Sequence, residues 1–175
     1  PHADLPRPAA PNFIVKAARR VATLLEIAGG RTLVLFTSYR NLEAARDLLR
    51  TAGQLPFPLL CQGDQPRSTL LEQFREDVES VLLATASFWE GVDVVGEALS
   101  MVIIDKLPFA VPDDPLTAAR VDLLRRRGAS PFADYQLPQA TLALKQGFGR
   151  LIRHRSDRGV VAILDRRVAQ KGYGK

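Results

Sequence analysis

Five short apolar segments constrain the fold of this chain of 175 residues more than any other feature. They are TLVLF, FPLLC, VLLAT, LSMVIID and GVVAILD, at residues 32–36, 57–61, 81–85, 99–105 and 159–165. Short apolar runs of this kind are typical of strands buried on both faces of a parallel sheet. Helical patterns lie between them, and strands that alternate with helices predict an α/β fold with helices on both faces of the sheet.

Apolar residues recur at helical spacing before and between these segments. The first predicted helix ends at Gly29 and Gly30 and has on one face Val15, Ala18, Val21, Ala22 and Leu25. The second has Leu42, Ala45, Leu48 and Leu49. A third is predicted to start with a capping box of Thr69 and Glu72, ahead of Leu70, Leu71, Phe74 and Val78. Two more helices are predicted over 115–127 and 137–153.

Ligands of parallel α/β sheets bind at the loops that follow the carboxyl ends of the strands. We therefore expect functional residues just after Phe36, after Ala84 and after Ile104, and in the helix that precedes the last strand.

Composition narrows the class of protein. Hydrophobic residues make up 46% of the chain and charged residues 25%, which is typical of a globular domain. The longest purely apolar run is residues 160–164, too short to span a bilayer, and no signal peptide opens the chain. The single cysteine, Cys61, is expected to be a small buried hydrophobe. With two isolated histidines and one cysteine, we predict no metal site and a reducing, cytoplasmic setting.

Charge is distributed unevenly along the chain. Residues 1–119 contain 11 basic and 15 acidic side chains, whereas residues 120–175 contain 13 basic and 4 acidic ones. A basic half of this kind suits a polyphosphate or nucleic-acid partner. A solvated basic surface without a partner is the alternative.

The stretch QGFGRLIRHRSDRG, at 146–159, contains four arginines, and its first half, in a predicted helix, includes two glycines, Gly147 and Gly149. On a helical wheel Gln146, Arg150 and Arg153 form one polar stripe, opposite Leu144 and Leu151. Gly147 and Gly149 would let another backbone or a ligand approach closely, at a cost of about 1 kcal/mol each. Two arginines and a glutamine that converge on one point are suited to bind a transferring phosphoryl group. A solvated face is the alternative.

These residues carry a resemblance. QGFGRLIR resembles motif VI (Q-x-x-G-R-x-x-R) of superfamily 2 helicases, TLVLFTSYRNLEAA resembles motif IV, and SFWEGVD and the final DRR are similar to the flanks found in DinG-type DNA helicases, bacterial relatives of XPD. The resemblance covers residues 12–175. It implies the second, C-terminal RecA-like domain of a two-domain motor, so that the chain is expected to be one domain cut from a longer protein, with residues 1–11 as an extended lead-in.

The resemblance implies which residues would face ATP. Arg153 would be the arginine finger and Arg150 its partner at the γ-phosphate, with Gln146 and Gly149 beside them. In motif V, Asp93 would reach the ribose or the coupling network, Gly91 would keep the loop tight, and Glu90 would couple the two sites. A loop carboxylate that caps a turn is the alternative for Asp93, and a local salt bridge is the alternative for Glu90.

The resemblance also implies which residues would contact DNA. Thr37, Ser38 and Tyr39 follow the first strand, where hydroxyls and helix N-terminal amides can hold a phosphate. Thr85 would contact the DNA backbone. Phe88 and Trp89 could stack on bases. The alternatives are a helix cap for Ser38, an ordinary strand end for Thr85, and packing at the domain edge for Phe88 and Trp89.

The expected partners are ATP and Mg²⁺, single-stranded or branched DNA, and the N-terminal RecA-like domain of the same protein; no membrane is expected. The chain contains neither G-x-x-x-x-G-K-[ST] nor D-E-x-H, so we expect it to be inactive alone. An iron–sulfur cluster is possible in the longer protein, but one cysteine cannot hold it here. A full protein without a P-loop would instead indicate a nucleic-acid-binding fragment. A dinucleotide-dependent enzyme is disfavoured because FTSYRN is not a glycine-rich turn.

Overall fold

The computed structural model describes residues 5–51, 55–85, 88, 99–109, 114–149, 151 and 158–174. The α-helices in these ranges are α1 (Phe13–Ala28), α2 (Tyr39–Thr51), α3 (Arg67–Glu76), α5 (Pro115–Arg126), α6 (Leu137–Phe148) and α7 (Arg167–Gln170). The strands are β1 (Thr32–Phe36), β2 (Leu59–Cys61), β3 (Val81–Thr85), β4 (Met101–Ile104) and β5 (Val160–Ile163). A π-helical turn, η1 (Phe132–Gln136), precedes α6, and a 3₁₀ turn, η2 (Gly172–Gly174), follows α7.

The five strands form one parallel sheet in the order β2-β3-β1-β4-β5. Each of the five apolar segments is therefore confirmed as a strand. β1 and β3 have the predicted bounds, whereas β2, β4 and β5 are shorter than the segments that predicted them. β1 lies at the centre, which explains why every residue of TLVLF is buried.

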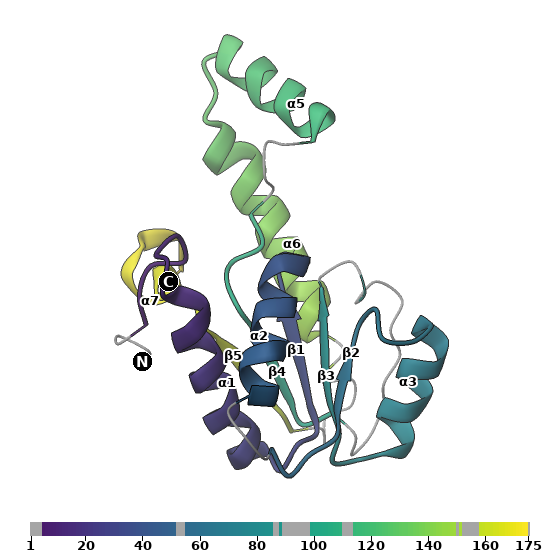
Figure 1. Ribbon diagram of the computed structural model, residues 1–175. Helices are drawn as coiled ribbons and strands as arrows, with labels where there is room; N and C mark the ends of the chain where they lie inside the picture. The colour runs from purple at the N-terminus through teal and green to yellow at the C-terminus, as the bar shows by residue number, and fades with distance from the viewer. Residues whose placement is uncertain are drawn as a thin grey trace.

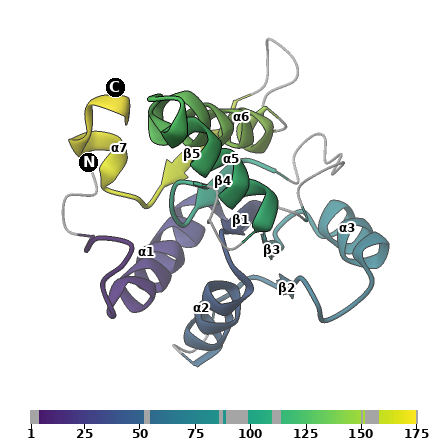
Figure 2. The same cartoon turned by 90° about the horizontal axis from the view of Figure 1, so that it is seen from above.

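Helices cover both faces of the sheet, as predicted (Figures 1 and 2). Because side chains alternate along a strand, β1 contributes to two separate cores. Val34 and Phe36 belong to the core under α1 and α2, which includes Val21, Leu25, Leu42 and Leu49. Leu33 and Leu35 belong to the core on the opposite face, which includes Leu70 and Phe74 of α3. Figure 2 shows α1 and α2 on one side of the row of strands and α3 and α6 on the other.

The turn between α1 and β1 explains the glycine pair that ends the first helix. Gly29 adopts the left-handed conformation as the C-cap of α1 (φ 64°), and Gly30 has φ 74°. A Cβ on Gly30 would lie 1.8 Å from the carbonyl oxygen of Glu79, so only glycine fits there. The predicted stop is therefore confirmed, although Val15 of the predicted apolar face is 36% exposed and Ala17 is buried in its place.

Residues before α1 fold back onto the domain. Leu5 is 2% exposed and packs into the core under α1. The chain then turns, because Ala10 donates to the carbonyl of Arg7 and Phe13 donates to that of Ala10. The described part of the predicted lead-in is thus anchored and turned, not extended.

The predicted capping box of α3 is wrong. The helix begins at Arg67, two residues before Thr69, with Pro66 as the N-cap and no side-chain cap hydrogen bond. Thr69 is therefore already inside the first turn and cannot cap it. Val78 lies beyond the helix and is 37% exposed.

The last predicted helix, 137–153, ends earlier than expected. α5, η1 and α6 form an arm that extends beyond the carboxyl edge of the sheet, and α6 runs back along the sheet (Figure 1). α6 ends at Phe148, with Gly149 as its C-cap, and Leu151 donates to the carbonyl of Phe148 in a turn. A Cβ on Gly149 would lie 2.7 Å from the carbonyl oxygen of Lys145, so this glycine permits the tight turn. α6 therefore contains Gln146 of the predicted stripe, whereas Arg150 and Arg153 lie outside the described residues.

Candidate functional site

The carboxyl edge of the sheet gathers the polar residues that follow four of the strands. β1 and β3 are paired so that Phe36 lies beside Thr85, and β4 pairs with β5 so that Ile104 lies beside Ile163. The loops after these strands therefore start at one level. This edge contains Thr37, Ser38, Tyr39 and Thr85, which the sequence analysis assigned to DNA. It also contains two buried aspartates that the sequence analysis did not assign.

Asp105, directly after β4, holds the loop that follows β1. Its side chain accepts from the backbone N–H of Thr37 at 3.0 Å and from Nδ2 of Asn41 at 3.0 Å. It also accepts from the N–H of Lys106 at 2.7 Å. Burial raises the pKa of Asp105, although the hydrogen bonds from Asn41 and from the backbone oppose this shift. The aspartate thus fixes Thr37 at the edge of the sheet.

Ser38 is the N-cap of α2. Its Oγ accepts from the backbone N–H of Asn41 at 3.3 Å, three residues along the chain. The capping role that the sequence left open for Ser38 is therefore present. The same position leaves the first N–H groups of α2 at the carboxyl edge of the sheet, where they favour an anion.

Gln62, after β2, links the loop after β1 to the end of β3. Its Oε1 accepts from the backbone N–H of Thr85 at 2.7 Å and from the Thr85 hydroxyl at 3.0 Å. Its Nε2 donates to the hydroxyl of Tyr39. Thr85 is 6% exposed and Tyr39 is 50% exposed, so the network runs from the sheet interior to the surface.

Asp165 ties the end of β5 to the loop after β4. Its fully buried carboxylate accepts from Nη2 of Arg167 at 2.6 Å and from the backbone N–H of Leu107 at 3.0 Å. Burial alone would raise the pKa of Asp165, but the Arg167 side chain and the two backbone donors outweigh burial and lower it. The same pair raises the pKa of Arg167. Asp165 therefore remains ionised and holds Arg167 at the carboxyl edge.

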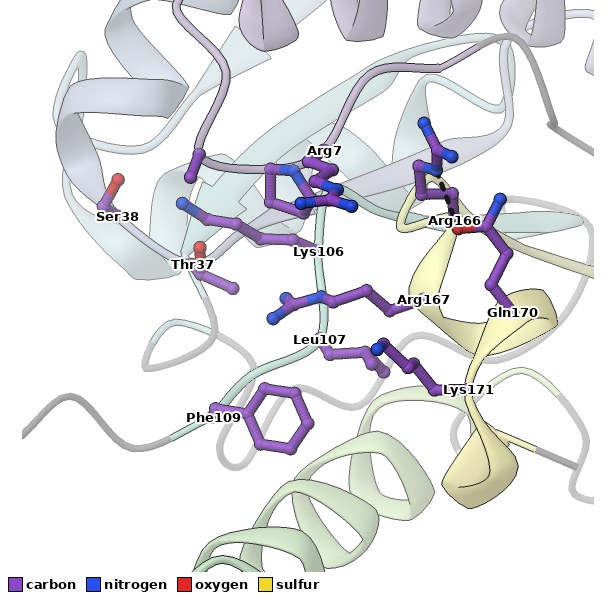
Figure 3. A pocket seen from close by; sticks show the side chains of 12 residues that line it. Arg7, Thr37, Ser38, Lys106, Leu107, Phe109, Arg166, Arg167, Gln170 and Lys171 are labelled. Atoms are coloured by element: carbon purple, nitrogen blue, oxygen red, sulfur yellow. Dashed lines mark hydrogen bonds between the residues drawn. The ribbon is translucent and has the colours of Figure 1, made fainter.

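A cavity of about 770 Å³ opens between these loops. Its walls come from the segment before α1, from the loops after β1 and β4, and from α7 with its flanks (Figure 3). The lining residues are Arg7, Pro8, Ala9, Thr37, Ser38, Lys106, Leu107, Phe109, Arg166, Arg167, Gln170 and Lys171. Five of them are cationic and none is acidic.

Several predicted site residues lie outside the described residues. These are Trp89, Glu90, Gly91, Asp93, Arg150 and Arg153. Phe88 is described, and its ring is 5% exposed in the core beside α3, with the Arg67 guanidinium 5.3 Å from its centroid. This burial favours the packing alternative for Phe88 and leaves no free face for a base.

The described part of the motif VI stretch lies at the end of α6. Gln146 is exposed, on the opposite side of the helix from Leu144, which packs against the core. A Cβ on Gly147 would lie 3.9 Å from Cδ1 of Leu35 and 4.0 Å from Cδ1 of Ile104. Gly147 thus faces the sheet, and the expectation that it opens space for a ligand is wrong because its neighbours are core side chains.

Cys61 is buried and free, as predicted, and burial raises the pKa of its thiol. Among the described residues, no group of three or more His, Cys, Asp or Glu side chains could hold a metal ion. None of the described helices is long and apolar enough to cross a bilayer.

Sequence reasoning did not identify Gln62, Asp105, Asp165 or the cationic walls of the cavity. A signal for the two aspartates was present, since IID and ILD place a carboxylate at the end of two adjacent buried strands. Gln62 and Arg7 carry no comparable signal, because their roles depend on which distant loops meet them.

Comparison with known proteins places this edge in context. A family model described as a helicase C-terminal domain matches residues 21–175. The ATP-dependent DNA helicase YoaA of Haemophilus influenzae is 50% identical over 152 residues, which are 87% of this chain and 23% of that protein. The ATP-dependent helicase DinG of Mycobacterium tuberculosis is 48% identical over 155 residues, covering 89% of this chain and 23% of that protein. The chain thus spans about a quarter of the length of these relatives.

Solved structures agree on the architecture. An apo XPD structure superposes on 96% of this chain and 34% of its own length, with a TM-score of 0.74 and 19% identity. At that identity the likeness concerns the fold alone, a RecA-like parallel sheet.

Proposed function

The chain belongs to the helicase C-terminal domain family, in its DinG-type branch, and we propose that it is the second motor domain of an ATP-dependent DNA helicase. In this proposal a first RecA-like domain of the same protein holds most of ATP and Mg²⁺. The chain completes the ATP site and supplies part of the track for a single DNA strand. We further propose 5′–3′ unwinding in DNA repair or replication, in the cytoplasm.

One observation carries the DNA half of the proposal: Gln62 links Tyr39, at the start of α2, to Thr85, at the end of β3. Thr37 and Ser38 lie at the same edge, beside the N-terminus of α2. Hydroxyls and backbone N–H groups bind phosphate oxygens without reading bases. The arrangement therefore suits a strand bound through its backbone, independently of sequence, as a translocating motor requires.

The ATP half of the proposal rests on motif VI. Arg153 is assigned as the arginine finger and Arg150 as its partner at the γ-phosphate, with Gln146, Gly149, Gly91, Asp93 and Glu90 around them. Arginine suits this task because its planar guanidinium stays charged and offers two parallel donors to phosphate oxygens. When ATP and Mg²⁺ are bound, the chemistry supplied is phosphoryl transfer to water. The chain's own contribution is to bring the guanidinium groups to the developing charge when the domains close.

The proposal is tested on the full-length protein that carries this chain. We expect ATP hydrolysis that increases on addition of single-stranded DNA, and unwinding of a duplex with a 5′ single-stranded tail. A duplex with a 3′ tail is the matched control for the direction of unwinding, and we expect it not to be unwound. A full-length protein that lacks a P-loop, or that binds DNA without hydrolysing ATP, would exclude the motor and leave the nucleic-acid-binding alternative.

A further inference from the structure

We propose that the cationic cavity at the carboxyl edge is a second binding site for the backbone of a single DNA strand, built by Arg7, Lys106, Arg166 and Lys171. This inference rests on the proposed function and extends the track beyond the motif residues. Arg7 lies outside the residues matched by the family model, and none of these four cations belongs to the predicted ATP or DNA sites.

The charge of the cavity favours a polyanion. Its lining includes five cations and no carboxylate. Among the described residues, Arg167 is the one lining cation with an ion pair, to Asp165, while Arg166 donates to the neutral Gln170 at 2.9 Å. Arg7, Lys106 and Lys171 have no described carboxylate within ion-pair distance. Like charges gathered without counter-charges are unfavourable unless a ligand neutralises them.

The two buried aspartates offset only part of this charge. Asp165 is fully buried and is paired with Arg167. Asp105 lies beneath the wall, where its oxygens accept from Thr37, Asn41 and the backbone of Lys106. Both carboxylates are thus used to position the wall. Asp105 also attracts the Lys106 charge, but Lys106 forms no ion pair with a described carboxylate and lines the cavity (Figure 3).

The walls are fixed before any ligand binds. Leu5, 2% exposed in the core, anchors the segment that carries Arg7. On the other side, Phe109, Phe132 and Tyr173 form a cluster with ring centroids 5.2–6.0 Å apart. This cluster fastens η2 to the loop after β4 and to the start of the helix that continues into α6. Lys171, which lies between α7 and η2, is therefore held across from Lys106, and little ordering is needed on binding.

The shape of the cavity favours a strand over a small phosphate. The four cations come from three separate segments around a cavity of about 770 Å³, which has room for more than one phosphate. A chain of phosphates can contact them in succession. The cavity is also continuous with Thr37 and Ser38, which line its wall and begin the proposed DNA track. A strand that leaves this loop would therefore enter the cavity.

The test uses the full-length protein without nucleotide and a fluorescein-labelled oligothymidine. We compare the wild type with the Lys106→Gln/Lys171→Gln double variant by fluorescence anisotropy across a salt series. Each phosphate contact to single-stranded DNA contributes about 0.7 to the slope of log K against log salt. Loss of two contacts should reduce the slope by about 1.4 and the affinity at 0.1 M salt by about 25-fold. A thermal melt of each variant checks that it is folded.

A Lys16→Gln/Arg19→Gln variant is the matched control. Both residues are exposed on α1 and do not line the cavity, so the same loss of charge should leave the salt slope unchanged. An equal loss in both variants would reduce the effect to net charge and overturn the inference. Displacement of the strand by micromolar pyrophosphate would also overturn it, in favour of a small polyphosphate ligand.

The failure of this inference differs from the failure of the proposed function. If the cavity variant keeps the wild-type slope while the wild type shows DNA-stimulated ATP hydrolysis, the cavity is not part of the track and the motor remains. If the wild type shows neither DNA binding nor DNA-stimulated hydrolysis, both fail.

Discussion

Gln62 and Thr85 are joined by two hydrogen bonds to the same amide oxygen, from the Thr85 backbone N–H at 2.7 Å and from its hydroxyl at 3.0 Å. The other end of the amide donates to Tyr39. One side chain from the edge of the sheet thus orients two residues of the proposed DNA track. Because Thr85 is almost fully buried, Gln62 takes the place of water as an acceptor for its N–H and its hydroxyl.

Replacing Gln62 by Leu should destabilise the domain by about 1–3 kcal/mol, because it leaves a buried N–H and a buried hydroxyl without this acceptor. Urea unfolding monitored by circular dichroism measures the change. Gln62→Glu keeps an acceptor for Thr85 but removes the donor to Tyr39, so it should recover much of the stability. If the Leu variant is as stable as the wild type, water must accept the hydrogen bonds of the Thr85 N–H and hydroxyl in place of Gln62.

The pair of Asp165 and Arg167 predicts a dependence of stability on pH. The folded-state pKa of Asp165 is lowered, so the ionised carboxylate stabilises the fold above its ordinary pKa of about 4, and this contribution is lost as pH falls through the lower folded value. Arg167→Met removes the charged partner of a fully buried carboxylate. We expect the free energy of unfolding to fall by about 2–3 kcal/mol at pH 7. This value is below that of a fully buried ion pair because Arg167 is partly exposed.

The difference between Arg167→Met and the wild type should shrink as pH falls, because Asp165 is protonated first in the variant. It should be lost only below the lowered folded-state pKa of Asp165 in the wild type, where the carboxyl is neutral in both proteins. Thermal melts from pH 3 to pH 7 measure it. Arg166→Met is the control, since Arg166 bonds only to the exposed Gln170 among the described residues. If the stability difference is constant from pH 3 to pH 7, it arises from packing of the aliphatic part of the Arg167 side chain and not from its charge.

The fold could be predicted from sequence because its strands and helices are encoded locally. TLVLF and VLLAT predict β1 and β3 with correct bounds, since a fully apolar run admits few alternatives. The ends of the helices were harder to predict than the strands. Thr69 has the spacing of a capping box, but Pro66 starts α3 earlier, and Gly149 ends α6 where the apolar spacing continues to Leu151.

The site was predictable only where it depends on strand ends. Thr37, Ser38 and Thr85 lie where a parallel sheet places ligands. Gln62 orients Thr85 across 23 residues of sequence, and Asp105 holds Thr37 across 68 residues. Such pairings depend on strand order, and β2-β3-β1-β4-β5 cannot be read from periodicity. The cationic cavity depends on the same order, because it joins β1, β4 and the two ends of the described chain.

Purified residues 1–175 should not hydrolyse ATP at a measurable DNA-dependent rate. Phosphoryl transfer depends on positioning and on charge neutralisation, and this sequence lacks the P-loop that would hold the triphosphate and Mg²⁺. A coupled assay of phosphate release, with and without oligothymidine, measures it. Circular dichroism confirms that the chain is folded. Robust DNA-stimulated turnover by this chain alone would contradict its assignment as half of a motor.

The sharpest prediction concerns Arg153 in the full-length protein. If Arg153 is the arginine finger, its guanidinium reaches the γ-phosphate when the two motor domains close, and it stabilises charge mainly in the transition state. Such fingers contribute on the order of 10³–10⁵ in rate. Arg153→Ala should therefore reduce DNA-stimulated kcat by about that factor while ATP affinity changes little. Arg153→Lys should also be severely impaired, because lysine keeps the charge but loses the planar pair of donors.

Arg155→Ala is the matched control for Arg153→Ala. Arg155 lies two residues further along the same arginine-rich stretch but outside the Q-x-x-G-R-x-x-R pattern, so its loss removes the same charge without a motif position. We expect a mild change in turnover and unwinding for this variant. Because α6 ends at Phe148, the assignment of Arg153 depends on the motif and not on a helical stripe. Near-normal turnover in Arg153→Ala together with loss of turnover in Arg155→Ala would show that the finger is a different arginine of this stretch.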